Sequence, residues 1–575
     1  MLFYTIYSIM ADEVTLQNSL QSQENIFDFQ NRQFTYVPDQ NNGSYPSGQI
    51  VFDLASFANS GKYVDWSQSL LVIPLVLNLN AASGSFGNGL DSAFAASLKN
   101  GAHQLISSMS VELTNNQVVN LTSFSNLDIN YKLLTSMSAD DQLNFGKTLL
   151  FSKDTAESVF YQGLNTSALG AGECNNNIKQ STFATTNGWG ATAIDNNAGR
   201  LDRMFYTSFD LSSSLVPSKY TNSSLCNTNL KNYVTYSTSN ITYYITATIP
   251  LRILHDIFKK LPLTKGTYAR LIINTNTACT CNLTLTTSTG VITAMTVASQ
   301  SGVLPFQITP CASNSGQGWN AGSCTSLSAT LGIAKCYNTS LTAVANHSLS
   351  QARVYGCMYD MSPIIEQKYL SLMPSKKVVY NDILSFQVMN TAAGSNFSQI
   401  LTNGISRARY LLICPQHSAS THGASTAAAS TYSSTIVVPT GTGPMNSPFS
   451  SSPGTCLPYS SITNFNVLES GVNHYQSNLT FRWENWLEEV RQSNSLQGGL
   501  QLGLSSGLLS QSDYENGYGF IYVDLSRKQS QASDDVARSI QIVGTNSSLV
   551  AMDLYCIIGY EREITISTAT GSLII

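Results

Sequence analysis

Alternation of apolar and polar residues constrains the fold of this 575-residue chain more than any other feature. In residues 241–249, every second residue is apolar, and Thr or Tyr stands between them. Residues 71–79 and 550–560 show the same period of two. This period is typical of strands that bury one face. Pro74 interrupts one of these stretches and, because proline cannot donate to a strand ladder, indicates an edge strand or a bulge.

Turn signals and short helices separate the strands. The segments around Asn115–Asn116 and Gly544–Ser548 predict hairpins. Two stretches carry apolar residues at helical spacing and predict short helices inserted between strands. These residues are Leu251, Leu254, Ile257, Phe258 and Leu261 in the first, and Trp483, Trp486, Leu487 and Val490 in the second. We interpret the two tryptophans as core anchors. Many strands and few helices favour sandwiches or barrels over a parallel α/β sheet.

Long irregular stretches divide the strand-rich blocks. They are expected to form long loops at residues 160–200, 285–326 and 416–462, the last being rich in Ser, Thr, Ala, Gly and Pro. The strand-rich blocks separate near residue 345 into two halves with similar contents. The expected organisation is an N-terminal arm over 1–45, a first domain with long insertions over 46–345, and a second domain over 346–575.

The chain is unusually poor in charge. Lys and Arg number 29 against 34 Asp and Glu, and charged residues make up 11% of the sequence, where a soluble domain averages about 25%. Hydrophobic residues reach 42%, which excludes a highly charged disordered chain. A surface with so little charge suits a protein whose flanks are covered by neighbours. No basic run is present, so direct sequence-specific nucleic-acid binding is not expected.

Neither a membrane span nor a secretory signal is expected. The longest apolar run, Leu70–Leu79, is far shorter than the roughly 18 residues of a membrane helix. The first ten residues, MLFYTIYSIM, lack a positive n-region and a cleavage site. Either translation starts at Met10, or this segment is an apolar arm that docks on a partner. N-x-[ST] sequons, for example at Asn120, Asn282 and Asn478, do not establish secretion in a chain this rich in Asn, Ser and Thr.

Two groups stand out among the eleven cysteines. Cys357, Cys414 and Cys556 lie in apolar strand-like runs and are expected to be core residues. The spacing of the second group lacks the paired knuckles of zinc sites but leaves one or two local disulfides open. This group contains Cys279, Cys281, Cys311, Cys324 and Cys336.

Motifs that carry chemistry are missing. The sequence has no phosphate-binding loop, HExxH, GxSxG or GxGxxG pattern. The histidines are scattered and are expected at surface or turn positions: His103, His255, His347, His417, His422 and His474. The acidic doublets Asp140/Asp141, Glu488/Glu489 and Asp534/Asp535 are expected on solvated faces, because adjacent acids point in different directions. We therefore expect no enzyme and no catalytic, cofactor-binding or metal-binding residues.

Several segments resemble double jelly-roll major capsid proteins of eukaryotic polinton-like viruses and virophage relatives, the lineage that includes adenovirus hexon. The resemblance is strongest after about residue 460. There it covers NFNVLESGVNHYQSNLTFRWENWLEEVR, GLLSQSDYENGYGFIYVDLSRK and SIQIVGTNSSLVAMDLYCIIGYEREITISTATG. In the first half, it covers DWSQSLLVIPLVLNLN and IPLRILHDIFKKLPLTKGTYARLIINTN. These segments are fold signatures without catalytic meaning.

The resemblance implies an all-β chain with two eight-stranded jelly rolls side by side. It further implies homotrimers that form pseudo-hexagonal capsomers of an icosahedral virion shell around double-stranded DNA. Neighbouring capsomers, pentons and minor capsid proteins would be the partners, and the long loops would form towers at the outer end. The N-terminal arm would run along the inner side or clasp a neighbour. Whether a membrane lines the shell stays open.

Three other functions are compatible with a jelly-roll sequence. A secreted β-sandwich adhesin or lectin would explain the Ser/Thr richness, but it requires a signal peptide. A carbohydrate-active jelly-roll enzyme requires two facing carboxylates about 5–10 Å apart. A penton or minor capsid protein needs only one jelly roll, and this chain has strands enough for two.

Overall fold

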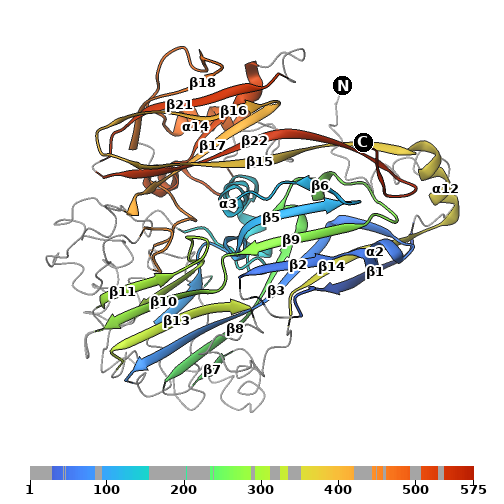
Figure 1. Ribbon diagram of the computed structural model, residues 1–575, viewed down its shortest axis with the longest axis horizontal. Helices are drawn as coiled ribbons and strands as arrows, with labels where there is room; N and C mark the ends of the chain where they lie inside the picture. Colours follow the sequence, from blue (N-terminus) through green and yellow to red (C-terminus); the bar gives the residue numbers. More distant parts are fainter. Residues whose placement is uncertain are drawn as a thin grey trace.

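The computed structural model consists mainly of antiparallel β-sheets, which form two sandwiches (Figure 1). The structure describes residues 29–42, 45, 47–84, 94–154, 203, 234–236, 239–285, 292–310, 324–333, 351–419, 443–448, 450–457, 461–492, 507–528, 536–548 and 550–574. We call the sandwich built from β1 to β14 the first jelly roll and the one built from β15 to β23 the second jelly roll.

The first jelly roll places an eight-stranded sheet against a four-stranded sheet, with a separate two-stranded ladder. The large sheet contains β1 (Phe29–Pro38), β3 (Tyr63–Ser83), β7 (Val234–Tyr236), β8 (Asn240–Pro250), β10 (Cys279–Leu285), β11 (Ile292–Ala298), β13 (Ser326–Ile333) and β14 (Arg353–Met361). The smaller sheet contains β2 (Gln49–Asp53), β5 (Ile106–Leu113), β6 (Asn116–Val119) and β9 (Ala269–Thr275). The ladder pairs β4 (Phe94–Leu98) with β12 (Phe306–Pro310).

The second jelly roll is more regular. One sheet runs β15 (Ser375–Thr391), β22 (Met552–Ser567), β17 (Ala408–His417) and β20 (Ile521–Asp524), with β23 (Leu573–Ile574) beside β22. The other sheet runs β16 (Asn396–Ile405), β21 (Arg538–Asn546), β18 (Ile462–Glu469) and β19 (Val472–Asn473). Without β23, this sandwich has the two four-stranded sheets of an eight-stranded jelly roll.

The three alternating stretches form strands as predicted. In β8, the five apolar residues of 241–249 are buried and the residues between them are more exposed. Residues 552–560 lie in β22, and 71–79 lie in β3. Most of 71–79 is buried on both faces, because β3 lies inside the large sheet, between β8 on one edge and β13 and β14 on the other.

The prediction that Pro74 marks an edge strand or a bulge was wrong. The register of β3 with β8 runs through Pro74 without a shift. On the opposite edge of β3, the pairing with β14 ends at Val72 and the pairing with β13 begins at Leu75. Pro74 therefore lies where one neighbouring strand gives way to the next, and a residue without an N–H is tolerated there.

One of the two predicted hairpins exists. β5 and β6 pair across Thr114 and Asn115, whose positive φ angles of 48° and 65° suit a tight hairpin turn. The prediction of a hairpin at Gly544–Ser548 was wrong. The turn there joins β21 to β22, which belong to the two different sheets of the second jelly roll. A turn signal shows that the chain reverses direction but not whether the two flanking strands pair.

The helices differ from the prediction in number and continuity. α14 (Trp483–Gln492) forms as expected, with Trp486 fully buried against Trp483 and Tyr514. The helix predicted over 251–261 is instead two short helices, α10 (Leu251–Leu254) and α11 (Ile257–Lys260), because His255 between them has an extended backbone. Helices that the sequence reasoning missed are α2 (Ala55–Asn59), α3 (Ser125–Ser136), α4 (Ala139–Phe145), α12 (Pro363–Leu372) and α16 (Gln511–Gly517).

Two other expectations need correction. The stretch 285–326 is not one long loop, because β11 and β12 lie within it. The division at residue 345 does not follow the strand pairing, because β14 hydrogen-bonds with β1 and β3 of the first jelly roll. β1 itself falls within the expected arm 1–45. The predicted loop 160–200 and most of 416–462 lie outside the described residues.

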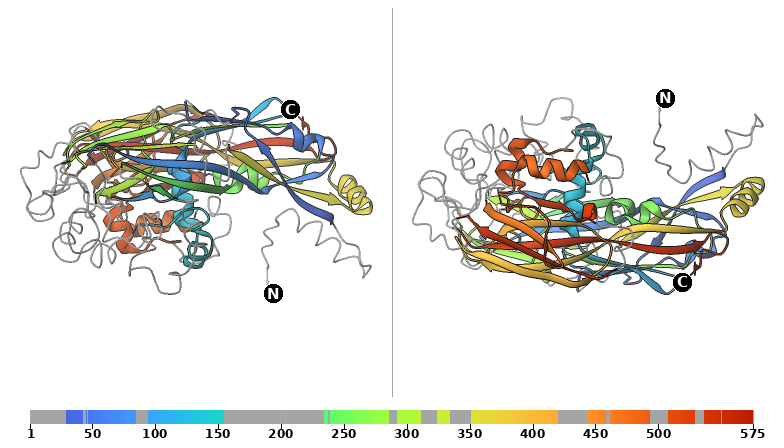
Figure 2. Two further views of the ribbon diagram at one scale, coloured as in Figure 1. Left: turned by 90° about the horizontal axis from the view of Figure 1, so that it is seen from below. Right: turned by 90° about the horizontal axis from the view of Figure 1, so that it is seen from above.

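The two jelly rolls share one hydrophobic core. The main cluster of buried residues includes Leu77 and Ile273 of the first jelly roll and Ile413 and Ile558 of the second. The sheet of β15 and β22 faces α3 and the β5–β9 sheet (Figure 1). α12, the C-terminus and one end of β1 lie together at one end of the molecule (Figure 2). Because the core is continuous, the two sandwiches form one body.

A close backbone contact in the second jelly roll yields a test of its packing. A Cβ on Gly559 of β22 would lie 1.9 Å from the ring of Tyr410 on β17, which is fully buried. Gly559→Ala should lower the free energy of unfolding by about 1–3 kcal/mol, the usual cost of overpacking. Gly404→Ala, an exposed strand glycine with no atom within 4 Å of its added Cβ, is the matched control. Equal urea midpoints for the two variants would contradict this packing.

Candidate functional site: the junction between the two jelly rolls

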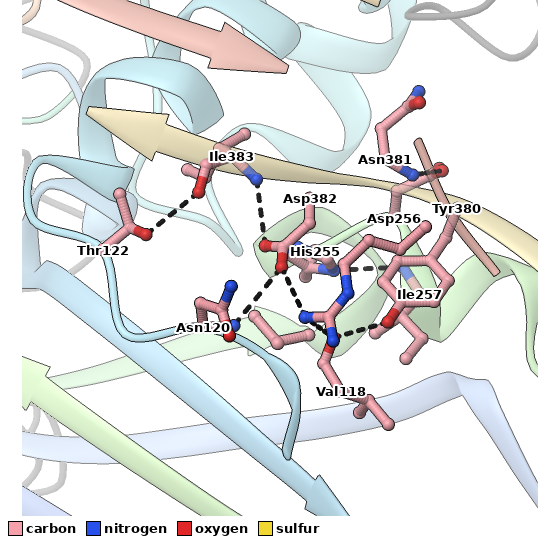
Figure 3. Close-up of polar contacts among 12 residues, drawn as sticks. Val118, Asn120, Thr122, His255, Asp256, Ile257, Tyr380, Asn381, Asp382 and Ile383 are labelled. Carbon is pink, nitrogen blue, oxygen red and sulfur yellow. Dashed lines mark hydrogen bonds and ion pairs between the residues drawn. The ribbon is translucent and has the colours of Figure 1, made fainter. Parts of the chain in front are cut away.

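A buried carboxylate, Asp382 of β15, lies at the junction between the jelly rolls (Figure 3). Its side chain is 0% exposed. Within the second jelly roll, Arg562 Nη1 lies 3.0 Å from Oδ2, and the Tyr560 hydroxyl donates to the same oxygen at 3.1 Å. From the first jelly roll, the backbone N–H of Asn120 donates to Oδ2 at 3.4 Å. A buried charge persists only when it is paired and hydrogen-bonded, so Asp382 requires both jelly rolls.

His255 completes this cluster from the first jelly roll. Its Nε2 lies 3.4 Å from Asp382 Oδ1. Its Nδ1 accepts a hydrogen bond from the backbone N–H of Ile257 at 3.2 Å, so a proton on Nε2 faces the carboxylate. Burial alone would raise the pKa of Asp382, but the adjacent His255 and Arg562 hold it below its ordinary value.

Backbone carbonyls of the first jelly roll bind the same group of side chains. Arg562 donates to the Val118 carbonyl at 2.9 Å, and the hydroxyl of Tyr380 donates to that carbonyl as well. Thr122 donates to the Ile383 carbonyl at 3.0 Å in the opposite direction. β6 and the connection after it are therefore hydrogen-bonded to β15 and β22 on both sides of the buried charge.

A second buried contact ties α3 to the second jelly roll. The hydroxyl of Tyr410 donates to Asp128 Oδ1 at 2.9 Å, and Lys132 Nζ lies 2.6 Å from Asp128 Oδ2. Burial, followed by the neighbouring Asp128 charge, raises the pKa of Tyr410 well above its usual value. Tyr410 therefore remains a hydrogen-bond donor across the whole physiological range of pH.

A buried lysine forms a third tie. Lys99, 0% exposed, donates from Nζ to the carbonyls of Pro444, Met445 and Ser452, at 3.3, 3.2 and 2.6 Å. The backbone of the same segment pairs with the first jelly roll, since the N–H of Leu304 donates to the Met445 carbonyl. These contacts fix residues 443–448 and 450–457, which belong to the second half of the chain, against β4 and β12.

The histidine prediction was wrong for four of the six residues. His103, His255, His417 and His474 are all buried, at 2, 6, 1 and 8% exposure. His474 Nδ1 lies 2.8 Å from Glu469 Oε1, and His103 Nε2 lies 2.9 Å from Asn130 Oδ1. Each of these four rings has a hydrogen-bond partner on one nitrogen, and sequence spacing does not reveal such partners. His347 and His422 lie outside the described residues.

The acidic doublets separate as expected, but one member is buried. Asp140 is exposed, whereas Asp141 is half-buried and caps α4, where hydrogen bonds from the backbone and hydroxyl of Ser138 lower its pKa. Glu488 is exposed, whereas Glu489 is 4% exposed and accepts the backbone N–H of Asp524 at 2.9 Å. The prediction that both glutamates lie on a solvated face was therefore wrong for Glu489. Asp534 and Asp535 lie outside the described residues.

The cysteines with described positions are free thiols. Cys357, Cys414 and Cys556 are buried in strands, which confirms them as core residues. Cys279, Cys281 and Cys324 are also buried and unbonded to one another, while Cys311 and Cys336 lie outside the described residues. Among the described residues, no group of three or more His, Cys, Asp or Glu is placed to bind a metal. No helix in the same ranges has the length and apolar character that a bilayer crossing requires.

The Asp382 cluster predicts a large loss of stability on removing one charge. Asp382→Asn leaves Arg562 facing a neutral side chain at a mostly buried site, so the free energy of unfolding should fall by about 3 kcal/mol. Lys377→Gln breaks the exposed pair with Glu563 across the same two strands and should change it by less than about 1 kcal/mol. Urea denaturation of both variants measures the difference. A loss no greater for Asp382→Asn than for Lys377→Gln would refute the role of the cluster.

His103 predicts an acid dependence of stability. Burial lowers its pKa from 6.5 to about 4. The unfolded chain therefore binds more protons below pH 6.5, and stability falls as the pH drops toward 4. Between pH 7 and pH 5, His103 should account for about 2 kcal/mol of lost stability. His103→Gln should lose correspondingly less than the unmodified chain over this interval in urea unfolding; identical losses would rule out this source.

Comparison with known proteins identifies the fold. No family model and no curated protein matches the sequence. Among solved structures, the chain is similar to a protein in the 3.5 Å cryo-EM structure of the Sputnik virophage, with 11% identity, a TM-score of 0.51, and 96% of this chain and 90% of that chain covered. It also matches the mavirus major capsid protein (10% identity, TM-score 0.44, 100% and 95% covered) and the faustovirus major capsid protein (8%, 0.44, 94% and 92%). The Sputnik likeness confirms the predicted fold: the chain is a double jelly roll.

Proposed function

We propose that this chain is a viral major capsid protein that trimerises into pseudo-hexagonal capsomers of an icosahedral shell. The observation that carries this proposal is the likeness to the Sputnik virophage protein along nearly the full length of both chains. For this role, the important feature of the fold is that one chain contains two jelly rolls, so that three chains present six. No catalytic residue is assigned, and the role is mechanical.

The junction supports this proposal physically. A closed three-fold assembly of a chain with two similar sandwiches presents six sandwiches around its axis. Such a ring keeps its shape only if the two sandwiches of each chain do not move relative to each other. The continuous core and the Asp382 cluster supply that rigidity.

The surface composition is compatible with extensive contacts between copies. Charged residues are scarce at 11% of the chain, and obligate interfaces are depleted in charge and rich in apolar residues. Large apolar side chains that are more than a third exposed occur on several elements: Phe34 and Tyr36 on β1, Ile364 and Leu372 on α12, Val379 and Met389 on β15, and Ile400 on β16. We propose that neighbouring chains and capsomers cover part of these side chains.

The remaining partners follow from the same proposal. The shell would enclose a double-stranded DNA genome in the virion and would be completed by pentons and minor capsid proteins. The net charge of −5 and the absence of basic runs argue against direct sequence-specific binding of nucleic acid by this chain. For the domains, we propose a first jelly roll that extends through β14 and a second that begins with β15, and an arm confined to the residues before β1.

The oligomeric state tests the proposal. Size-exclusion chromatography with light scattering on the purified full chain should give the mass of three 62.2-kDa chains. Negative-stain electron microscopy of the same peak should show particles with six-fold pseudo-symmetry. A stable monomer at micromolar concentration would overturn the capsid role.

A further inference from the structure

A small polar pocket lies beside the Asp382 cluster, where α3, α10, α11 and β15 meet. It measures about 50 Å³. Its polar lining comes from both jelly rolls and consists of Lys132, Ser136, Arg252, Asp256, Lys259 and Asn381. In Figure 3, the Asn381 side chain points away from Asp382, which separates this pocket from the buried cluster.

The pocket carries an excess of positive charge. Lys132 is paired with Asp128 at 2.6 Å, and the Asp256 carboxylate accepts the backbone N–H of Asn381 at 3.2 Å. Arg252 and Lys259 form no hydrogen bond or ion pair with any other residue that the structure describes. Two cations therefore face the same small volume, and Asp256 is the single carboxylate in its lining.

The charges around Lys259 show the same imbalance. Desolvation lowers the pKa of the Lys259 ammonium. Among the neighbouring charges, Asp256 acts most strongly and raises this pKa, while Lys132, Arg252 and Lys260 each lower it. The cations of the pocket thus repel one another, and the Asp256 carboxylate faces three of them: Lys132, Arg252 and Lys259. A bound dianion would attract these cations, and this attraction would replace the net repulsion among them.

Size and donor chemistry define the ligand. One water needs roughly 10–15 Å³ on this scale, so the pocket accommodates about four oxygen atoms. A guanidinium binds two oxygens of a tetrahedral oxyanion in a fork, and an ammonium adds a point charge. The hydroxyl of Ser136 and the amide of Asn381 supply neutral donors to the lining. We propose that this pocket binds a phosphate group, with Arg252 and Lys259 as its principal ligands.

Asp256 gives the pocket a preference between oxyanions. Near neutral pH, phosphate retains a proton on one oxygen and can donate it to a carboxylate, whereas sulfate has no proton to donate. A carboxylate in the lining therefore favours hydrogen phosphate and disfavours sulfate. Because Asn381 lies on β15 and the cations lie on α3, α10 and α11, a bound phosphate also connects the two jelly rolls. It should stabilise the folded chain, which alone carries the site.

Titration calorimetry and thermal unfolding of the full chain test this site. Inorganic phosphate, at constant ionic strength set with sodium chloride, should bind saturably with one site per chain and raise Tm by a few degrees. Arg252→Gln/Lys259→Gln should weaken binding at least tenfold and abolish the Tm rise. Lys147→Gln, which removes one exposed lysine charge that is not in the lining, is the control and should bind as the unmodified chain does.

Further ligands identify the source of the phosphate. Competition by deoxyadenosine monophosphate would extend the site to nucleotide phosphates, and its failure to compete would restrict the site to the free anion. Both results support the pocket. An equal Tm rise in the double variant, an equal rise with added chloride, or equal binding of sulfate would overturn the proposal. Since the test uses binding and not assembly, its outcome is independent of the capsid role.

Discussion

The burial of one negative charge, the Asp382 carboxylate, fixes the position of the two jelly rolls relative to each other. Asp382 is fully buried, and its partners come from three separate parts of the chain: β22, the connection after β6 and the break between α10 and α11. Moving one jelly roll away from the other would remove His255 and the Asn120 N–H from this carboxylate. The carboxylate would keep Arg562 and Tyr560 of its own jelly roll but would lose two of the groups that compensate its desolvation, so a partly separated arrangement is costly. The shared apolar core acts in the same direction but tolerates small sliding movements, whereas hydrogen bonds to a carboxylate do not.

The elements that could be predicted from the sequence have one buried face and one exposed face. β8 has one buried and one more exposed face, and its period of two is visible in the residues themselves. α14 has a buried Trp486 and an exposed Glu488, and its helical spacing is equally visible. α3 escaped detection because ten of its twelve residues are buried, including Asn126, Asp128 and Asn130, so no amphipathic pattern exists. α12 begins with Pro363 after Ser362, a start signal that was present in the sequence and was overlooked.

The junction could not be predicted from the sequence, because its residues are ordinary in isolation. Asp382 follows Asn381 in a strand, and His255 lies between two helical turns. Only the tertiary arrangement brings the two within 3.4 Å. The same holds for Lys99, whose ammonium is surrounded by carbonyls of a segment more than 340 residues away in the chain. Burial of His255 and Lys99 depends on such distant partners.

The 21-residue strand β3 gives the first jelly roll a mechanical property. β8 lies along one of its edges, while β14 and then β13 lie end to end along the other, with Pro74 at the point of exchange. A force applied along this strand would load its ladders in shear, so that many hydrogen bonds must break together. The ladder with β14 ends at Val72 and the ladder with β13 begins at Leu75, but the ladder with β8 continues past both points. The three ladders therefore do not end at the same position along β3. β8 thus holds β3 together across the point where β14 gives way to β13, and the sheet resists stretching along this strand.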